Sequence, residues 1–192
     1  MALILIFAGV VLLFSIAVPA PAERLATLSE VLPLPVLEIA HVMAGATGVG
    51  LIFLARGLSL RLEAAYRLAA LLLGVGIVTL VCKGLIYEGA AVLTAILVVL
   101  FYTRPEFRRD GALFNHGFTT EWTSTLTALL AVTIWLGLLS YKPAEYSHEL
   151  WWHFDYTAEY ARFLRSMTVV LMTTVVIGLA TLLRPDPDGV SL

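Results

Sequence analysis

Long apolar runs, separated by short polar segments, restrict the fold of this chain more than any other feature of its sequence. A helix needs roughly 20 mostly apolar residues to cross a bilayer. Charged residues make up only 14% of the chain, whereas soluble domains carry roughly a quarter. The sequence therefore predicts an all-α integral membrane protein, a helical bundle with about six transmembrane helices. The six runs that qualify are 2–19, 36–55, 68–86, 89–102, 122–141 and 166–183.

Two polar segments between these runs predict short helices at the membrane surface. Residues Ala22 to Leu32 mix apolar and charged side chains in the manner of an amphipathic helix, and two prolines follow them. Asp155 to Arg165 has a similar character and leads into the last run. No lysine or arginine precedes run 2–19, which argues against a secretory signal, so we expect a membrane helix there too.

Basic residues predict how these helices are oriented, because loops rich in lysine and arginine stay in the cytoplasm. Segments 56–67 and 103–121, together with Arg184, hold 7 of the 12 basic residues. We therefore expect both termini in the cytoplasm, with segment 142–165 outside or dipping into the outer leaflet. Residues 1–184 are the expected transmembrane domain. Residues 185–192, which are rich in proline and aspartate, are the expected linker toward a cytosolic domain.

The segment from Tyr141 to Phe154, YKPAEYSHELWWHF, gathers charges and aromatic rings between two apolar runs. One interpretation is a belt of aromatic residues at the membrane surface with a few solvated charges. The other is a binding surface, because charges at that depth are costly unless they pair with one another or with a ligand headgroup. The candidate binding residues in this segment are Lys142, Glu145, Tyr146, Glu149, Trp151 and Trp152.

Ionisable residues also occur inside the predicted spans, where each is a candidate functional residue. Glu38 and His41 are three residues apart, so a helix places them on one face. Their functional role competes with a simple pair in which the two satisfy each other. Lys83 and Tyr87 are four apart and expected to face the same side, with Glu88 next to them. The alternative for Lys83 is a side chain that extends along the helix toward water.

The predicted orientation places all these candidates in the outward half of the bilayer. Acidic, basic and aromatic groups gathered there suit an amphiphile whose headgroup carries both signs of charge. A carboxylate pairs with an amine, while a lysine or arginine pairs with a phosphate.

Other classes of function lack support in the sequence. The nucleotide motif GxxxxGKS/T, the zinc motif HExxH and the nucleophile motif GxSxG do not occur. His148 and His153 are five residues apart, which is not the spacing that places two zinc ligands on one helical face. Cys82 is the single cysteine, and a net charge of −2 gives no reason to expect nucleic acid. We expect no catalytic residue, metal or cofactor in this chain.

Four stretches together resemble the multiple peptide resistance factor family of bacterial phosphatidylglycerol lysyl- or alanyltransferases, which also act as lipid flippases. They are ARGLSLRLEAAYRL (55–68), CKGLIYEGA (82–90), WLGLLSYKPAEYSHELWWHF (135–154) and ARFLR (161–165). The similarity covers nearly all of 36–184 and matches the membrane helices that precede the family's cytosolic enzyme domain. Two positions differ from the family's pattern, since Ile86 stands where an acid is expected and Gly89 replaces a glutamate.

The resemblance implies a membrane domain that binds and helps to translocate aminoacylated phosphatidylglycerol in the bacterial cytoplasmic membrane, and so resistance to cationic antimicrobial peptides. Aminoacyl-tRNA would be a partner only of a cytosolic domain outside these residues. The carboxylates Glu38, Glu88, Glu145 and Glu149 would hold amines, Lys83, Lys142 and His41 would meet phosphate, and Trp151 and Trp152 would fix the depth of the acyl chains. Tyr87 and Tyr146 complete the expected lipid-binding set.

Two further hypotheses stay open. The chain could be a structural scaffold that anchors the cytosolic enzyme and forms a homo-oligomer, with its charges merely holding helices together. A membrane enzyme acting on lipid is the weakest alternative, because no pair of nucleophile and base is evident.

Overall fold

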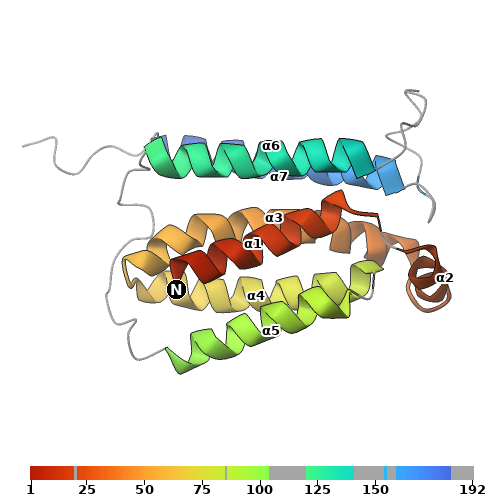
Figure 1. The fold of residues 1–192 in the computed structure, drawn as a ribbon, viewed down its shortest axis with the longest axis horizontal. Helices are drawn as coiled ribbons and strands as arrows, with labels where there is room; N and C mark the ends of the chain where they lie inside the picture. Colours follow the sequence, from red (N-terminus) through yellow and green to blue (C-terminus); the bar gives the residue numbers. More distant parts are fainter. Residues whose placement is uncertain (20, 85, 104–119, 141–153, 155–158, 183–192) are drawn as a thin grey trace, which may run out of the picture.

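The computed structural model describes residues 1–19, 21–84, 86–103, 120–140, 154 and 159–182, and all its regular elements in these ranges are α-helices. Six long helices run along a common axis, and a short one lies at one end of them (Figure 1). The helices are α1 (Ala2–Ala17), α2 (Ala22–Val31), α3 (Leu34–Ser59), α4 (Glu63–Gly84), α5 (Tyr87–Tyr102), α6 (Thr120–Ser140) and α7 (Glu159–Leu182).

The predicted all-helical fold is confirmed for the described residues, and each predicted run lies within or overlaps one long helix. Three stretches are long and apolar enough to cross a membrane: Leu34–Ser59, Glu63–Lys83 and Glu159–Ala180. The other apolar helices, including α1 and α5 with 16 residues each, are shorter in the described part of the chain. Sixteen residues span only about 24 Å of helix, somewhat less than the hydrocarbon core of a bilayer.

Prolines flank α2, and the predicted end of this helix before Pro33 is confirmed. Pro21 precedes its first residue, and the helix ends at Val31, where Leu32 and Pro33 adopt extended backbone. Pro35 lies in the first turn of α3, a position where its missing N–H costs nothing. The first predicted surface helix is therefore present as a helix.

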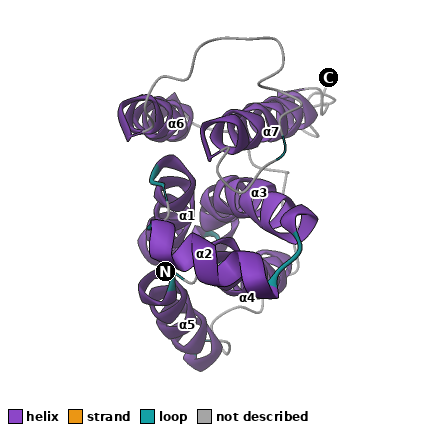
Figure 2. Ribbon diagram, turned by 90° about the vertical axis from the view of Figure 1, so that its right-hand side faces the viewer, coloured by secondary structure: helices purple, strands orange, loops and turns teal. Residues whose placement is uncertain are grey.

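Successive long helices reverse direction (Figure 1). Each end of the bundle therefore holds the C-terminal ends of some helices and the N-terminal ends of the others. We call one of them the α2 end, because α2 lies across it (Figure 2). The last turns of α1, α4 and α6 and the first turns of α3, α5 and α7 lie at this end. This arrangement decides which charged residues become neighbours.

The predicted loop over 56–67 is wrong. Helix α3 continues to Ser59 and α4 starts at Glu63, so the connection is only three residues long. Arg61 has a left-handed φ of 58°, and its N–H bonds to the carbonyl of Leu58 while that of Leu62 bonds to the carbonyl of Gly57. These two bonds form a Schellman motif, which closes a helix in very few residues. Glu63 and Arg67 then pair one turn apart on α4.

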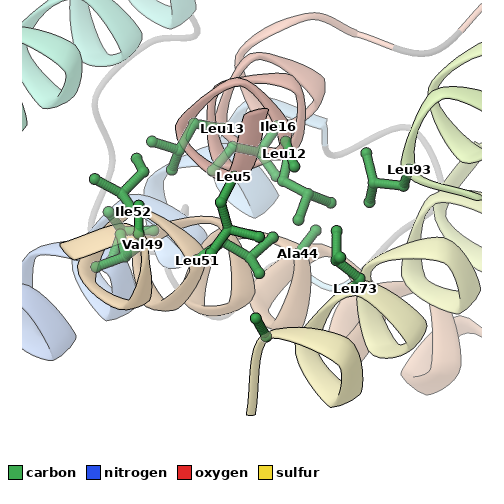
Figure 3. Packing of buried hydrophobic residues seen from close by; sticks show 14 of the residues in the cluster. Leu5, Leu12, Leu13, Ile16, Ala44, Val49, Leu51, Ile52, Leu73 and Leu93 are labelled. Atoms are coloured by element: carbon green, nitrogen blue, oxygen red, sulfur yellow. The ribbon is translucent and has the colours of Figure 1, made fainter. Parts of the chain in front are cut away.

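Helix α3 is at the centre of the bundle and packs against α1, α4 and α7 (Figure 2). It approaches α1 closely because glycines face each other. A Cβ atom added to Gly9 would lie 2.7 Å from the carbonyl oxygen of Gly48. Buried apolar side chains pack between these helices (Figure 3), among them Leu5, Leu12, Leu13 and Ile16 of α1, Val49, Leu51 and Ile52 of α3, Leu73 of α4 and Leu93 of α5.

Candidate functional site

Glu38 joins α3 to α7 through two arginines. Its Oε1 accepts a hydrogen bond from Nε of Arg162 at 3.1 Å, and its Oε2 accepts one from a terminal nitrogen of Arg165 at 2.8 Å. The two arginines are three residues apart, so α7 presents them on one face. Only 1% of the Arg162 side chain and 12% of the Glu38 side chain are exposed. This is a buried, charge-assisted bridge near the α2 end.

Arg165 is the outer member of this bridge. Its side chain is 15% exposed, and its guanidinium carbon lies 4.5 Å from the centre of the Phe154 ring. A guanidinium stacked over an aromatic face gains a cation–π attraction and loses some rotational freedom. The ring therefore holds Arg165 in an orientation that faces Glu38.

Lys83 lies in the last turn of α4 and points into the protein. Its Nζ donates hydrogen bonds to the main-chain carbonyl of Ser15 and, at 2.9 Å, to the hydroxyl of the same residue. The carbonyls in the last turn of a helix lack partners within the helix and attract positive charge. Lys83 therefore caps the C-terminal turn of α1, and only 2% of it is exposed.

His41 is buried one turn after Glu38 and lies close to the main chain of Ile16. Neither ring nitrogen makes a hydrogen bond of normal geometry with a described residue. The positively charged side chains of Lys83 and Arg162 lie close enough to the ring for an electrostatic interaction. The alternative of a self-satisfied pair between Glu38 and His41 is wrong, because the carboxylate of Glu38 bonds to the two arginines instead.

The expectation that Lys83 and Tyr87 face the same side is also wrong. Helix α4 ends at Gly84 and α5 begins at Tyr87, so the two residues belong to different helices. Lys83 is buried, whereas Tyr87 is 59% exposed. The alternative in which Lys83 extends toward water is wrong for the same reason.

Glu88, the next candidate, forms an ion pair with α2. Its carboxylate accepts a hydrogen bond of 3.1 Å from Arg24, and the side chains of Arg24 and Glu88 are 36% and 72% exposed. The hydrogen bond from Arg24 lowers the pKa of Glu88 below its ordinary value, with further help from a main-chain hydrogen bond and the charge of Arg24. This pair ties α2 to the start of α5 at the surface of the α2 end.

The remaining candidates belong to segment 141–153, which lies outside the described residues, as do residues 185–192. They are Lys142, Glu145, Tyr146, Glu149, Trp151 and Trp152.

We call Glu38, His41, Lys83, Arg162 and Arg165 the polar cluster. Glu38, His41 and Lys83 were candidates from the sequence, and the structure brings them to the same end of the bundle. Sequence reasoning missed Arg162 and Arg165 as site residues, although their spacing of three at the head of the last run was a usable signal. Ser15 carried no signal, because nothing local indicates which distant side chain binds its carbonyl.

The chemistry of the polar cluster suits charge recognition. Guanidinium and ammonium groups bind phosphate or carboxylate, and a carboxylate binds an amine. Within the described ranges, no group of three or more His, Cys, Asp or Glu side chains is arranged to hold a metal ion. Comparison of the sequence with protein-family models and with curated proteins gave no match.

Proposed function

We propose that this chain is the membrane domain of an aminoacyl-phosphatidylglycerol synthase and flippase, and that it binds lysyl- or alanyl-phosphatidylglycerol at the α2 end. The single observation that carries the proposal is the polar cluster, which buries Lys83 and Arg162 almost completely at one end of an apolar helical bundle. Charged groups at such depth are costly, and in membrane proteins they commonly belong to a substrate path or binding site. The sequence resemblance described above supports the same function.

The chemistry of the ligand matches the groups available. Each aminoacylated headgroup has one phosphate and at least one ammonium group. Lys83 and the two arginines of α7 offer donors for the phosphate. Glu38 and the more exposed Glu88 offer carboxylates for the ammonium.

We further propose six passes through the bacterial cytoplasmic membrane, with α2 lying at the outer surface and both termini in the cytoplasm. The reversal of direction between successive long helices supports this topology (Figure 1). In this orientation the polar cluster lies in the outer leaflet, where a translocated headgroup has to arrive. Transfer of the aminoacyl group from tRNA would fall to a cytosolic domain outside these residues.

Native mass spectrometry of the detergent-purified chain tests this function. Lysyl-, alanyl- and unmodified phosphatidylglycerol are offered in competition, and retention of each is measured. We expect selective retention of the aminoacylated lipids, reduced by about tenfold in Arg162→Gln, because a charge-assisted hydrogen bond is worth at least that factor. Arg67→Gln is the matched control, since Arg67 is an exposed arginine that pairs with Glu63, one turn earlier on α4. Equal and weak retention of all three lipids would contradict the proposal.

One observation favours a second candidate, a structural scaffold that anchors the cytosolic enzyme and carries an oligomer contact. Charged members of the polar cluster bond within the chain, Glu38 to two arginines and Lys83 to Ser15. Such contacts join α3 to α7 and α1 to α4 without any ligand. Under this function, Arg162→Gln lowers the stability of the chain but changes no lipid preference.

A further inference from the structure

We infer that the bridge from Glu38 to Arg162 and Arg165 is a selectivity device, in which an incoming phosphate takes over the arginines and releases the Glu38 carboxylate to the ammonium of the same headgroup. The inference rests on the proposed function, because it explains how the same site tells an aminoacylated lipid from plain phosphatidylglycerol. In this scheme Arg162 and Arg165 bind the phosphate of the lipid, and Glu38 pairs with these arginines only while no lipid is bound.

The geometry of the bridge provides for such an exchange. Each carboxylate oxygen of Glu38 receives one arginine, at 3.1 Å and 2.8 Å. Guanidinium groups bind carboxylate and phosphate through the same planar set of donors, so a phosphate reaching this face competes directly with Glu38. The carboxylate thus occupies in the resting protein the place that the phosphate takes in the complex.

Burial makes the exchange selective. Arg162 is 1% exposed and Glu38 only 12%, so either charge would be strongly destabilised without a partner. An anionic lipid brings a phosphate for the arginines but leaves the Glu38 carboxylate unpaired. An aminoacylated lipid brings both charges, so each charged group of the bridge keeps a partner of opposite sign. The site therefore selects lipids with an ammonium group, because binding any other lipid leaves the buried Glu38 carboxylate without a positively charged partner.

The outer edge of the bridge is where the exchange begins. The side chains of Glu38 and Arg165 are 12% and 15% exposed, whereas that of Arg162 is only 1% exposed. Phe154 lies against the guanidinium of Arg165 at 4.5 Å and keeps its plane fixed while the anionic partner changes. Arg165 receives the phosphate first and Arg162 second.

A matched pair of ligands tests the exchange. Alanyl-phosphatidylglycerol and its N-acetyl derivative have the same ester and nearly the same size, but only the first carries an ammonium group. Native mass spectrometry of the full chain measures the ratio in which the two are retained. The wild-type chain is expected to prefer the charged lipid by about tenfold or more, and Glu38→Gln to retain the two equally. Glu63→Gln, which removes an exposed carboxylate from α4, is expected to keep the preference.

The outcomes separate this inference from the proposed function. Equal retention of both lipids by the wild-type chain overturns the exchange, whereas the proposed function is overturned by equal and weak retention of lysyl-, alanyl- and unmodified phosphatidylglycerol. A wild-type preference that persists in folded Glu38→Gln leaves the proposed function standing and overturns the exchange. Where Glu38→Gln fails to fold, the double variant Glu38→Gln with Arg165→Gln removes one charge of each sign from the bridge. A preference for the charged lipid in that double variant would likewise overturn the exchange.

Discussion

Lys83 binds Ser15 through both the main-chain carbonyl and the hydroxyl, although the two residues are 68 positions apart in the chain. The ammonium group lies at the end of α1, where the helix presents carbonyls without helical partners. The hydroxyl of Ser15 also donates a hydrogen bond of 2.6 Å to the carbonyl of Leu12 in the same turn. Lys83 therefore fixes the end of α1 to the end of α4 beside the polar cluster.

Replacing Lys83 by methionine is expected to lower the free energy of unfolding by about 1–3 kcal/mol, because it leaves the partly buried carbonyl of Ser15 without its donor. Ser15→Ala keeps the carbonyl acceptor and should cost less, about 1 kcal/mol or below. Unfolding by a denaturing detergent in mixed micelles measures both. A methionine variant as stable as the wild type would show that the contact adds nothing to stability.

The glycine contact between α1 and α3 gives a prediction with an internal control. A Cβ atom at Gly9 would lie 2.6 Å from a side-chain carbon of Ile52 and 2.7 Å from the carbonyl oxygen of Gly48. Gly9→Ala is therefore expected to cost about 1–3 kcal/mol of stability, since the two backbones have to separate. A Cβ at Gly74 in α4 meets nothing within 4 Å.

Gly74→Ala is the control for helix propensity alone. It should leave the free energy of unfolding unchanged or raise it by up to about 1 kcal/mol, because alanine favours helix more than glycine does. Equal effects of the two substitutions in thermal unfolding would mean that α1 and α3 are not in close contact at Gly9.

Helix positions were largely predictable from the sequence, because apolar runs interrupted by proline and charge have few other ways to fold. Proline placed the end of α2 correctly, whereas α3 starts at Leu34, two residues before the predicted run 36–55. The loop over 56–67 was wrong because three arginines suggested solvent, whereas a Schellman motif needs only Leu60 to Leu62 to reverse the chain. Charge alone does not distinguish an exposed helical turn from a loop.

The polar cluster was only half predictable. Glu38 and Lys83 stood out because an ionisable residue in an apolar run is unusual. Their partners depend on which helices pack together: Arg162 is 124 residues from Glu38, and a single sequence holds no local sign of that contact. For the same reason Lys83 was expected to share a side with Tyr87, whereas its real partner is Ser15 of α1.

The Schellman motif after α3 gives a prediction at one backbone position. Arg61 adopts φ 58°, a left-handed conformation that is unfavourable for a side chain with Cβ and costs glycine nothing. Arg61→Gly is expected to raise the free energy of unfolding by about 0.5–1 kcal/mol, after the greater freedom of glycine in the unfolded chain is deducted. Leu60, at φ −85°, has no such strain, so Leu60→Gly should destabilise. A loss of stability in Arg61→Gly would show that the left-handed conformation of Arg61 does not strain the turn.

The surface pair between Arg24 and Glu88 predicts how acid affects α2. The arginine lowers the pKa of Glu88 in the folded chain below its ordinary value of 4.5. A carboxyl group whose pKa is lowered by folding stabilises the folded state above its ordinary pKa, and this contribution is lost as the pH falls through the lowered pKa. The link between α2 and the start of α5 through Arg24 and Glu88 should therefore weaken in acid below about pH 4.5 and be unaffected near neutrality. Because both side chains are exposed, the effect should be small and should shrink further at high salt.

Hydrogen exchange of the α2 amides, corrected for the intrinsic dependence on pH, measures this directly. Glu88→Gln should give at neutral pH the faster α2 exchange that the wild type reaches only in acid, and it should abolish the acid response. An acid response of equal size in Glu88→Gln would place its origin in another group.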